Sequence, residues 1–441
     1  MRSTQYVHYI AVAVLPLLAA CGGPPKEAAP EAGAAGLTEY GDWRPWAPRP
    51  ENAALLTVER EGARTPEGAL VVSGNGNRAV LGGWERTVEG IEPGRWYRLS
   101  LLYRYEGLTL HTRQVVCRLD WARTDGKRTG RPEYAWREEP EGDWTRLTLE
   151  APAPEDAAAV RIQLLLWDAP DGKVWFDDVN LEPVPAPEPR PVRIASVNFR
   201  PQRTGSAEES VRRFIELVDR EVRDEVDIIL LPEGITVVGT GKKYADVAEP
   251  VPGPTTERLA ELARRHNAYV AAGIYERDGP AIYNTAVLIG RDGKLAGKYH
   301  KVYIPREETE GGISPGSAYP VFETDFGKVG MMICWDTEYA DPARGLALGG
   351  AEIVLVPIWG GNETLVKARA IENQIYLVTS GYDFATRVYT PDGNIVAEAA
   401  KDGEVIRATV DLNRRWVEPW LGNMRGRFHR ELRLDVPVMP R

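Results

Sequence analysis

A run of ten residues with proline at every second position divides this chain into two parts. Residues 182–191 read Glu-Pro-Val-Pro-Ala-Pro-Glu-Pro-Arg-Pro. Each proline fixes φ at about −65° and removes a backbone donor, so the run can enter neither a helix interior nor the middle of a sheet. We therefore expect a stiff, extended linker. Because 441 residues are too many for one compact core, the linker indicates a boundary between two domains.

Residues 38–181, before the linker, are rich in short strand patterns separated by Gly, Pro and Asp turns. Strands are predicted over residues 95–103, 144–149, 160–166 and 172–181. Regular strands without a helical period indicate an all-β sandwich. The segment 172–181 resembles the last strand of galactose-binding-like jelly rolls related to carbohydrate-binding modules. The resemblance implies a jelly-roll domain and a possible glycan contact.

Three tryptophans of this domain, Trp84, Trp121 and Trp167, would stack on a sugar face if they were exposed. Tryptophans in a sandwich are more often core residues, so a spacer or docking role is the alternative to sugar binding.

Residues 192–441, after the linker, alternate between apolar runs and helical patterns. Strands are predicted over 192–199, 226–231, 268–274, 281–290, 329–334, 352–358 and 375–380, and helices over 208–223, 256–266 and 365–373. Near-continuous apolar strands, such as residues 228–231, belong to sheets that are covered on both faces. The second domain is therefore predicted to be a layered α/β fold.

Reactive side chains follow three of the apolar runs in this second part. Glu233 comes after residues 228–231, Lys301 follows a predicted hairpin strand, and Cys334 ends the run that begins at Val329. Rigid sheets aim the side chains at their strand ends into one crevice. Each residue alone has an ordinary structural explanation, but the three together predict a catalytic site.

These three contexts, in this order, resemble the nitrilase superfamily of carbon-nitrogen hydrolases. The helical run 367–374 is similar to the family's helix after the nucleophile strand. The resemblance implies an αββα four-layer sandwich, a Glu233–Lys301–Cys334 triad and a possible homodimer. It also implies a second glutamate after the lysine. Glu310 fits the family's short-loop pattern best, and Glu308 is the next candidate.

The chemistry of amide cleavage fits these residues without the resemblance. A thiol needs a base or a nearby cation to ionise at neutral pH, so Glu233 is expected to take the proton of Cys334. Lys301 and the backbone N–H of Trp335 would stabilise the oxyanion. Trp359 and Asn362, at predicted strand ends, are expected pocket walls together with Trp335. No cofactor is expected.

Other chemistries have less support in the sequence. The five histidines show no paired metal-ligand spacing, and none of them makes a convincing triad with a serine nucleophile elbow. No glycine-rich phosphate loop is present. The net charge is −10 and no run of five Lys or Arg occurs, so nucleic acid is not an expected partner.

The first residues predict export. An apolar stretch from Tyr9 to Ala20 ends in Leu18-Ala19-Ala20-Cys21, which resembles a bacterial lipobox. We expect a signal peptide over 1–20, lipidation of Cys21, and a Gly/Pro/Ala-rich tether over 21–37. Gly22 lacks the acidic character of an inner-membrane retention signal, so the outer membrane is favoured if the host has one.

Three functions remain open at this point. Hydrolysis of an amide or N-carbamoyl group through a thioester is the leading hypothesis. The second is acyl transfer to an amine. The third is a non-catalytic lipoprotein that binds glycan or protein. Of the three cysteines, Cys117 lies in an alternating apolar run and is expected to be a buried strand residue without a function.

Overall fold

A computed structural model describes residues 40–437 of the chain. The expected signal peptide (1–20), the tether (21–37) and the lipidation site Cys21 lie outside the described residues. Within residues 40–437, no helix is long and apolar enough to span a membrane.

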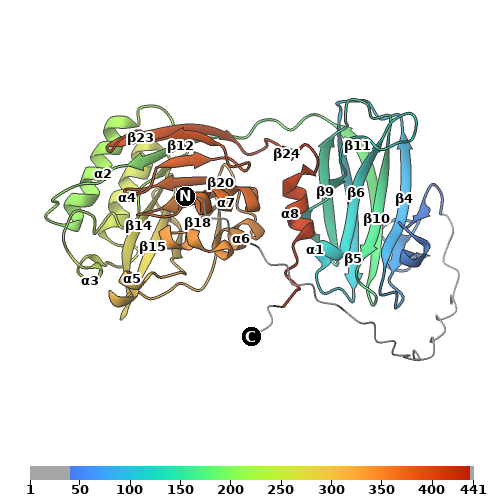
Figure 1. The fold of residues 1–441 in the computed structure, drawn as a ribbon, viewed down its shortest axis with the longest axis horizontal. Helices are drawn as coiled ribbons and strands as arrows, with labels where there is room; N and C mark the ends of the chain where they lie inside the picture. The colour runs from blue at the N-terminus through green and yellow to red at the C-terminus, as the bar shows by residue number, and fades with distance from the viewer. Residues whose placement is uncertain (1–39, 438–441) are drawn as a thin grey trace, which may run out of the picture. The chain divides into compact units, whose positions relative to one another are not determined.

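The first part of the described chain is a sandwich of two antiparallel sheets (Figure 1). The five-stranded sheet has the order β1 (Arg44–Trp46), β4 (Leu81–Glu89), β10 (Ala159–Trp167), β6 (Val115–Ala122), β7 (Glu133–Tyr134). The six-stranded sheet has the order β2 (Leu55–Glu59), β3 (Ala69–Ser73), β11 (Lys173–Val184), β5 (Trp96–Glu106), β9 (Trp144–Pro152), β8 (Arg137–Glu141). The all-β sandwich that the sequence indicates is therefore present.

The core between these sheets contains two of the tryptophans considered for sugar stacking. Trp84 and Trp121 are 0% and 1% exposed, so neither can stack on a ligand. Trp167 is 37% exposed, but the Arg113 guanidinium lies 4.3 Å from its ring centroid. Cys117 is buried in the same core, as expected for an inward-facing residue of β6.

The linker is shorter than the proline pattern predicts. Strand β11 continues to Val184, with Pro183 opposite Tyr97 and Val184 opposite Trp96 of β5. Strand β12 then begins at Pro191. Proline is tolerated near the end of a strand, because few hydrogen bonds between strands are lost there. Both ends of the proline-rich run can therefore belong to the sheets.

The second part contains two six-stranded mixed sheets. The first has the order β16 (Leu295–His300), β15 (Ala281–Ile289), β14 (Tyr269–Asp278), β13 (Ile228–Leu230), β12 (Pro191–Asn198), β23 (Glu404–Asp411). The second has the order β17 (Val321–Glu323), β18 (Lys328–Met331), β19 (Ile353–Pro357), β20 (Tyr376–Ser380), β21 (Arg387–Tyr389), β22 (Ile395–Glu398). The central strands β12–β13–β14 and β18–β19–β20 are parallel.

The two sheets face each other between two helical layers (Figure 1). Their inner faces share one apolar core, to which Ile228 and Leu355 both belong. Helices α2 (Ala207–Glu221) and α4 (Pro254–His266) pack their apolar faces on the first sheet. Helices α6 (Ala340–Leu348) and α7 (Glu363–Asn373) pack on the second. This arrangement confirms the predicted αββα sandwich.

The remaining elements are short. They are α1 (His111–Gln114), α3 (Tyr244–Val247), α5 (Arg306–Glu310), α8 (Met424–Glu431), the 3-10 turns η1 (Pro50–Asn52) and η2 (Cys334–Glu338), and a small pair of strands, β24 (Val417–Glu418) and β25 (Gly422–Asn423). Helix α8 contacts the β-sandwich, because Arg430 bonds to the carbonyl oxygens of Ala135 and Thr112. Helix α8 therefore does not pack on the α/β layers alone.

Candidate active site

Glu233 lies just beyond the end of β13 and is 3% exposed. Its backbone carbonyl accepts a hydrogen bond from the hydroxyl of Tyr382, at 2.8 Å. Gly273 of β14 passes beneath it so closely that a Cβ atom at Gly273 would lie 2.7 Å from Cα of Glu233. The absence of a side chain at Gly273 therefore lets the glutamate backbone sit directly on the sheet.

Lys301 immediately follows β16 and is 1% exposed. Its Nζ lies 3.0 Å from Oε1 of Glu233 and 2.9 Å from Oε2 of Glu308. Burial alone would lower the pKa of Lys301, but the negative charges of Glu233 and Glu308, with that of an ionised Cys334, raise it above its ordinary value. The lysine is therefore a permanent cation at the centre of the site.

Cys334 is the first residue of η2, three residues after β18 ends, and is partly exposed. Its φ of +42° is a left-handed conformation that costs a residue with a side chain about 1–2 kcal/mol. The Sγ–H donates to the carbonyl oxygen of Gly360 at 3.2 Å. Burial and the charge of Glu233 raise the pKa of the Cys334 thiol to about 12, against the lowering effect of Lys301.

The structure corrects the assignment of the second glutamate. Glu308 is 4% exposed and contacts Lys301, whereas the side chain of Glu310 is 62% exposed and pairs with Arg306. Both lie on α5, where successive residues are rotated by about 100°. Arg306 and Glu310, four residues apart, share the outer face, so Glu308 points to the opposite, inner side.

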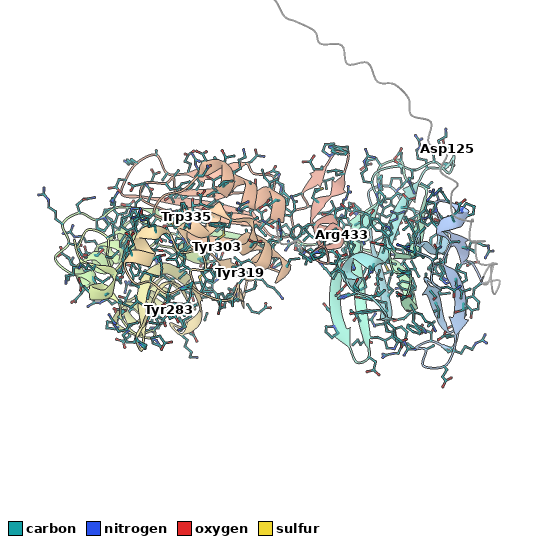
Figure 2. The ribbon with its side chains drawn as sticks, turned by 60° about the horizontal axis from the view of Figure 1, so that its bottom comes forward. Asp125, Tyr283, Tyr303, Tyr319, Trp335 and Arg433 are labelled. Atoms are coloured by element: carbon teal, nitrogen blue, oxygen red, sulfur yellow. The ribbon has the colours of Figure 1, made fainter. Side chains whose placement is uncertain are left out.

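The three expected pocket residues have different environments. Trp335, next to the nucleophile, is 39% exposed (Figure 2). Trp359 packs edge-on against Tyr382 at 4.9 Å between ring centroids. The side chain of Asn362 caps α7 by accepting hydrogen bonds from the amides of Thr364 and Leu365. Its amide oxygen therefore serves the helix, and its role as a pocket wall stays a prediction.

Asp336 ties the two strand ends of the site together. Its carboxylate accepts hydrogen bonds from the backbone amides of Ile333, at 2.9 Å, and Tyr303, at 2.9 Å. It also accepts one from the hydroxyl of Tyr299, at 2.7 Å. Ile333 precedes Cys334 and Tyr303 follows Lys301, so this buried group fixes the nucleophile turn relative to the lysine segment.

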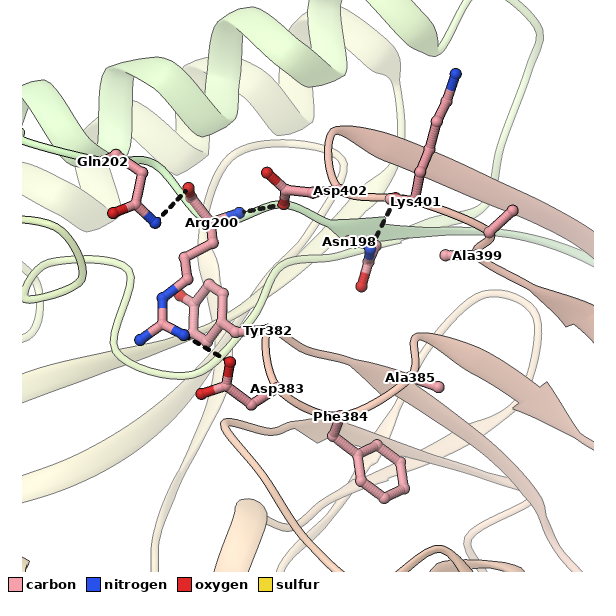
Figure 3. Close-up of a pocket in the computed structure, with 11 residues that line it drawn as sticks. Asn198, Arg200, Gln202, Tyr382, Asp383, Phe384, Ala385, Ala399, Lys401 and Asp402 are labelled. Carbon is pink, nitrogen blue, oxygen red and sulfur yellow. Dashed lines mark hydrogen bonds and ion pairs between the residues drawn. The ribbon is translucent and has the colours of Figure 1, made fainter.

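A pocket of about 420 Å³, shown in Figure 3, adjoins the site through Tyr382. It is lined by Asn198, Arg200, Gln202, Tyr382, Asp383, Phe384, Ala385, Ala399, Ala400, Lys401 and Asp402. The Arg200 guanidinium pairs with Asp383 at 2.6 Å and lies 5.4 Å from the Trp359 ring centroid. Tyr382 belongs to both places, because its ring lines the cavity while its hydroxyl bonds to Glu233.

Sequence reasoning missed two groups that contact the carboxylates. Asn284, in the middle of β15, bonds to both Glu233 and Glu308, and Tyr275 of β14 donates to Oε1 of Glu308 at 3.1 Å. The signal for Asn284 was the pair Asn284-Thr285 inside an otherwise apolar strand. A polar pair at such a position needs buried partners. Tyr275 offered no comparable signal, since tyrosine is common in strands.

Together these contacts bring a partly exposed thiol, two buried carboxylates and a buried ammonium into one neighbourhood. Lys301 lies 3.0 Å from Glu233, and the charges of both groups shift the pKa of Cys334. A nucleophile, a base and an oxyanion-stabilising cation are the groups that acyl transfer to a thiol requires.

Comparisons with known proteins agree with this geometry. The family model described as carbon-nitrogen hydrolase matches residues 193–415. An omega-amidase, NIT2, of Xenopus tropicalis is 30% identical over 234 residues, which cover 46% of this chain and 83% of the relative. A probable nitrilase of Schizosaccharomyces pombe is 33% identical over 214 residues, covering 44% and 78%.

Among solved structures, Nit3 of Saccharomyces cerevisiae, a member of branch 10 of the nitrilase superfamily, matches with 25% identity and a TM-score of 0.46, covering 50% of this chain and 90% of that one. The family match spans half of the sequence and includes Glu233, Lys301 and Cys334. The chain therefore belongs to the carbon-nitrogen hydrolase family and is an enzyme of its amidase type.

Proposed function

We propose that this enzyme hydrolyses small non-peptide amides, or N-carbamoyl groups, through a thioester on Cys334. The observation that carries the proposal is the contact of Lys301 with Glu233 and Glu308 beside a partly exposed thiol. The omega-amidase relatives support an amide as the substrate. The substrate itself would enter past the exposed Trp335.

In the proposed reaction, Glu233 takes the proton from the Sγ of Cys334, and the thiolate attacks the carbonyl carbon. Lys301 stabilises the negative charge that forms on the carbonyl oxygen. Glu233 then gives its proton to the departing nitrogen as the carbon-nitrogen bond breaks. A water molecule loses a proton to Glu233, attacks the thioester and releases the acid with regeneration of the thiol.

The base is needed because the resting thiol is hard to ionise. With a pKa of about 12, Cys334 holds almost no thiolate at pH 7 on its own. A base next to the thiol lets deprotonation and attack occur together, so the high pKa of the free group does not prevent catalysis. Glu233 is the carboxylate whose charge acts on Cys334 directly.

The decisive experiment is ammonia release from a panel of short-chain amides and N-carbamoyl compounds, with the products identified by mass spectrometry. Wild type is expected to release ammonia and the free acid in equal amounts, and Cys334→Ala is expected to release neither. Equal rates in both proteins would remove the thiol from the mechanism. An acyl-amine product in place of the free acid would identify a transferase.

Three further features are proposals about the whole protein. The lipobox-like sequence before Cys21 supports a lipid anchor in the cell envelope, with the outer membrane favoured. Fatty-acid labelling of wild type and of Cys21→Ser tests this anchor.

The jelly-roll-like last strand supports glycan contact through the sandwich. A glycan array with the full chain tests this contact. The family resemblance supports a homodimer, which light scattering tests.

A further inference from the structure

Asn284 on β15 is fully buried beside the proposed catalytic groups, and the reaction described above does not use it. Its backbone carbonyl accepts a hydrogen bond from the amide of Lys301 at 2.9 Å. Its side-chain Nδ2 donates to Oε1 of Glu233 at 2.7 Å and to Oε1 of Glu308 at 2.6 Å. One amide group therefore contacts both carboxylates.

Lys301 contacts the same two carboxylates through its ammonium. One positive charge cannot neutralise two negative ones, and like charges in a buried site disfavour ionisation of both groups. The NH₂ group of Asn284 supplies one donor to each carboxylate without adding charge. A hydrogen bond to an ionised carboxylate stabilises the ionised form. The Asn284 amide therefore offsets the part of the repulsion between the two carboxylates that the single charge of Lys301 does not cancel.

The contacts fix the orientation of this amide. With Oδ1 and Nδ2 exchanged, a carbonyl oxygen would lie 2.6–2.7 Å from two carboxylate oxygens, which is repulsive. In the observed orientation Oδ1 is buried and has no hydrogen-bond partner among the residues that the structure describes. Burying an unpartnered carbonyl is unfavourable, and a leucine would fill similar space without it. The two carboxylates are the groups that require an amide here.

We infer that Asn284 is a positioning residue, which holds the carboxylates of Glu233 and Glu308 around Lys301 through one donor each and so keeps Glu233 ready to accept the thiol proton. The inference rests on the proposed function of the same site. The titratable groups around Glu233 are Lys301, Glu308, Cys334, Tyr244, Tyr275 and Tyr382. Among the residues that the structure describes, none of the tyrosines donates to the Glu233 carboxylate, and its donors are Asn284 and Lys301.

The test compares the pH dependence of amide hydrolysis in wild type, Asn284→Leu and the control Thr285→Val. Loss of a hydrogen bond to a charged group corresponds to about a 10- to 100-fold effect. For Asn284→Leu, we expect the acid limb of kcat/KM to move up by about one pH unit or more. On the acid side of the limb, kcat at a given pH should fall about 10- to 100-fold, with KM changed much less.

Thr285 is a matched control because it neighbours Asn284 on β15, is fully buried, and donates to Glu276 at 3.0 Å, outside the cluster. Thr285→Val should lose stability without any movement of the acid limb. A superimposable pH profile for folded Asn284→Leu would overturn the inference.

A second readout needs no substrate. The rate of Cys334 alkylation by iodoacetamide, followed against pH, should show the same upward movement of the acid limb in Asn284→Leu. If wild type hydrolysed no amide while this limb still moved, the positioning role would stand and the substrate proposal would fail. Should Asn284→Leu not fold, Asn284→Asp keeps the size but adds a third carboxylate. An acid limb unchanged in Asn284→Asp would contradict the inference.

Discussion

Glu308 and Glu310 are two residues apart and have opposite environments. One turn of α5 buries Glu308 against Lys301 and Asn284 and leaves Glu310 beside Arg306 at the surface. The local sequence contains several glutamates in succession, so composition cannot decide between them. The orientation of α5 relative to the segment that contains Lys301 decides which glutamate faces the lysine.

This difference gives a paired prediction at the residue scale. Glu308→Gln removes a charge that contacts Lys301, so we expect kcat for amide hydrolysis to fall at least about 100-fold, as for loss of a charged group in a buried site. Glu310→Gln breaks an exposed ion pair, which contributes about 0–1 kcal/mol to stability, and should leave kcat within about twofold. Steady-state kinetics of the two variants checks both. Equal losses of kcat would show that burial does not identify the functional glutamate.

At the scale of elements, the site forms where strands of both sheets end on the same side of the α/β layers. Glu233 and Lys301 follow strands of the first sheet, and Cys334 follows β18 of the second. Strand patterns in the sequence predicted most of these elements, because continuous apolar runs are a local signal. Helix α6 was missed, since its Asp341-Pro342 start and small residues give a weak helical pattern.

Asp336 gives a prediction for this junction. Burial raises the pKa of Asp336 to about 6, against hydrogen bonds from the amides of Tyr303 and Ile333 that lower it. Because the folded pKa lies above the ordinary value of about 4, its stabilising effect is full below pH 4 and is lost as pH rises through 6. The free energy of unfolding of wild type, minus that of Asp336→Asn, should therefore fall by about 2–3 kcal/mol between pH 4 and pH 7.

Urea unfolding of both proteins at these two pH values measures the difference. A constant difference between pH 4 and pH 7 would mean that the hydrogen bonds outweigh burial and that Asp336 stays ionised throughout.

At the scale of the whole molecule, helix α8 contacts the β-sandwich as well as the α/β layers. Arg430 of α8 is 3% exposed, and its guanidinium donates to the carbonyl oxygens of Ala135, at 2.6 Å, and Thr112, at 2.7 Å, and to Glu138, at 3.2 Å. If the guanidinium of Arg430 were removed, these buried oxygen atoms would lose their hydrogen-bond donor. Residues more than 290 apart in sequence are therefore held together by one side chain.

Removal of this contact should destabilise the sandwich without affecting catalysis. For Arg430→Met we expect a loss of about 3 kcal/mol, which lowers Tm of the sandwich by about 5–10 °C. Arg433→Met is the control, because Arg433 forms a partly exposed pair with Asp435 and its loss should change Tm by about 1 °C or less. Calorimetry measures both values, and amide hydrolysis at 25 °C should be unchanged in each variant. An unchanged Tm in Arg430→Met would refute this role for α8.

The sequence by itself determined the fold class and the residue types of the site. Local patterns can be read from the sequence without the tertiary contacts. Such patterns include the apolar strands, the proline run and the contexts of Glu233, Lys301 and Cys334. The tertiary structure alone decided that Glu308 joins the lysine, that Asn284 bridges the carboxylates, and that Asn362 caps a helix. Each of these depends on which side of a short turn or strand faces the site, and that direction comes from packing between segments distant in sequence.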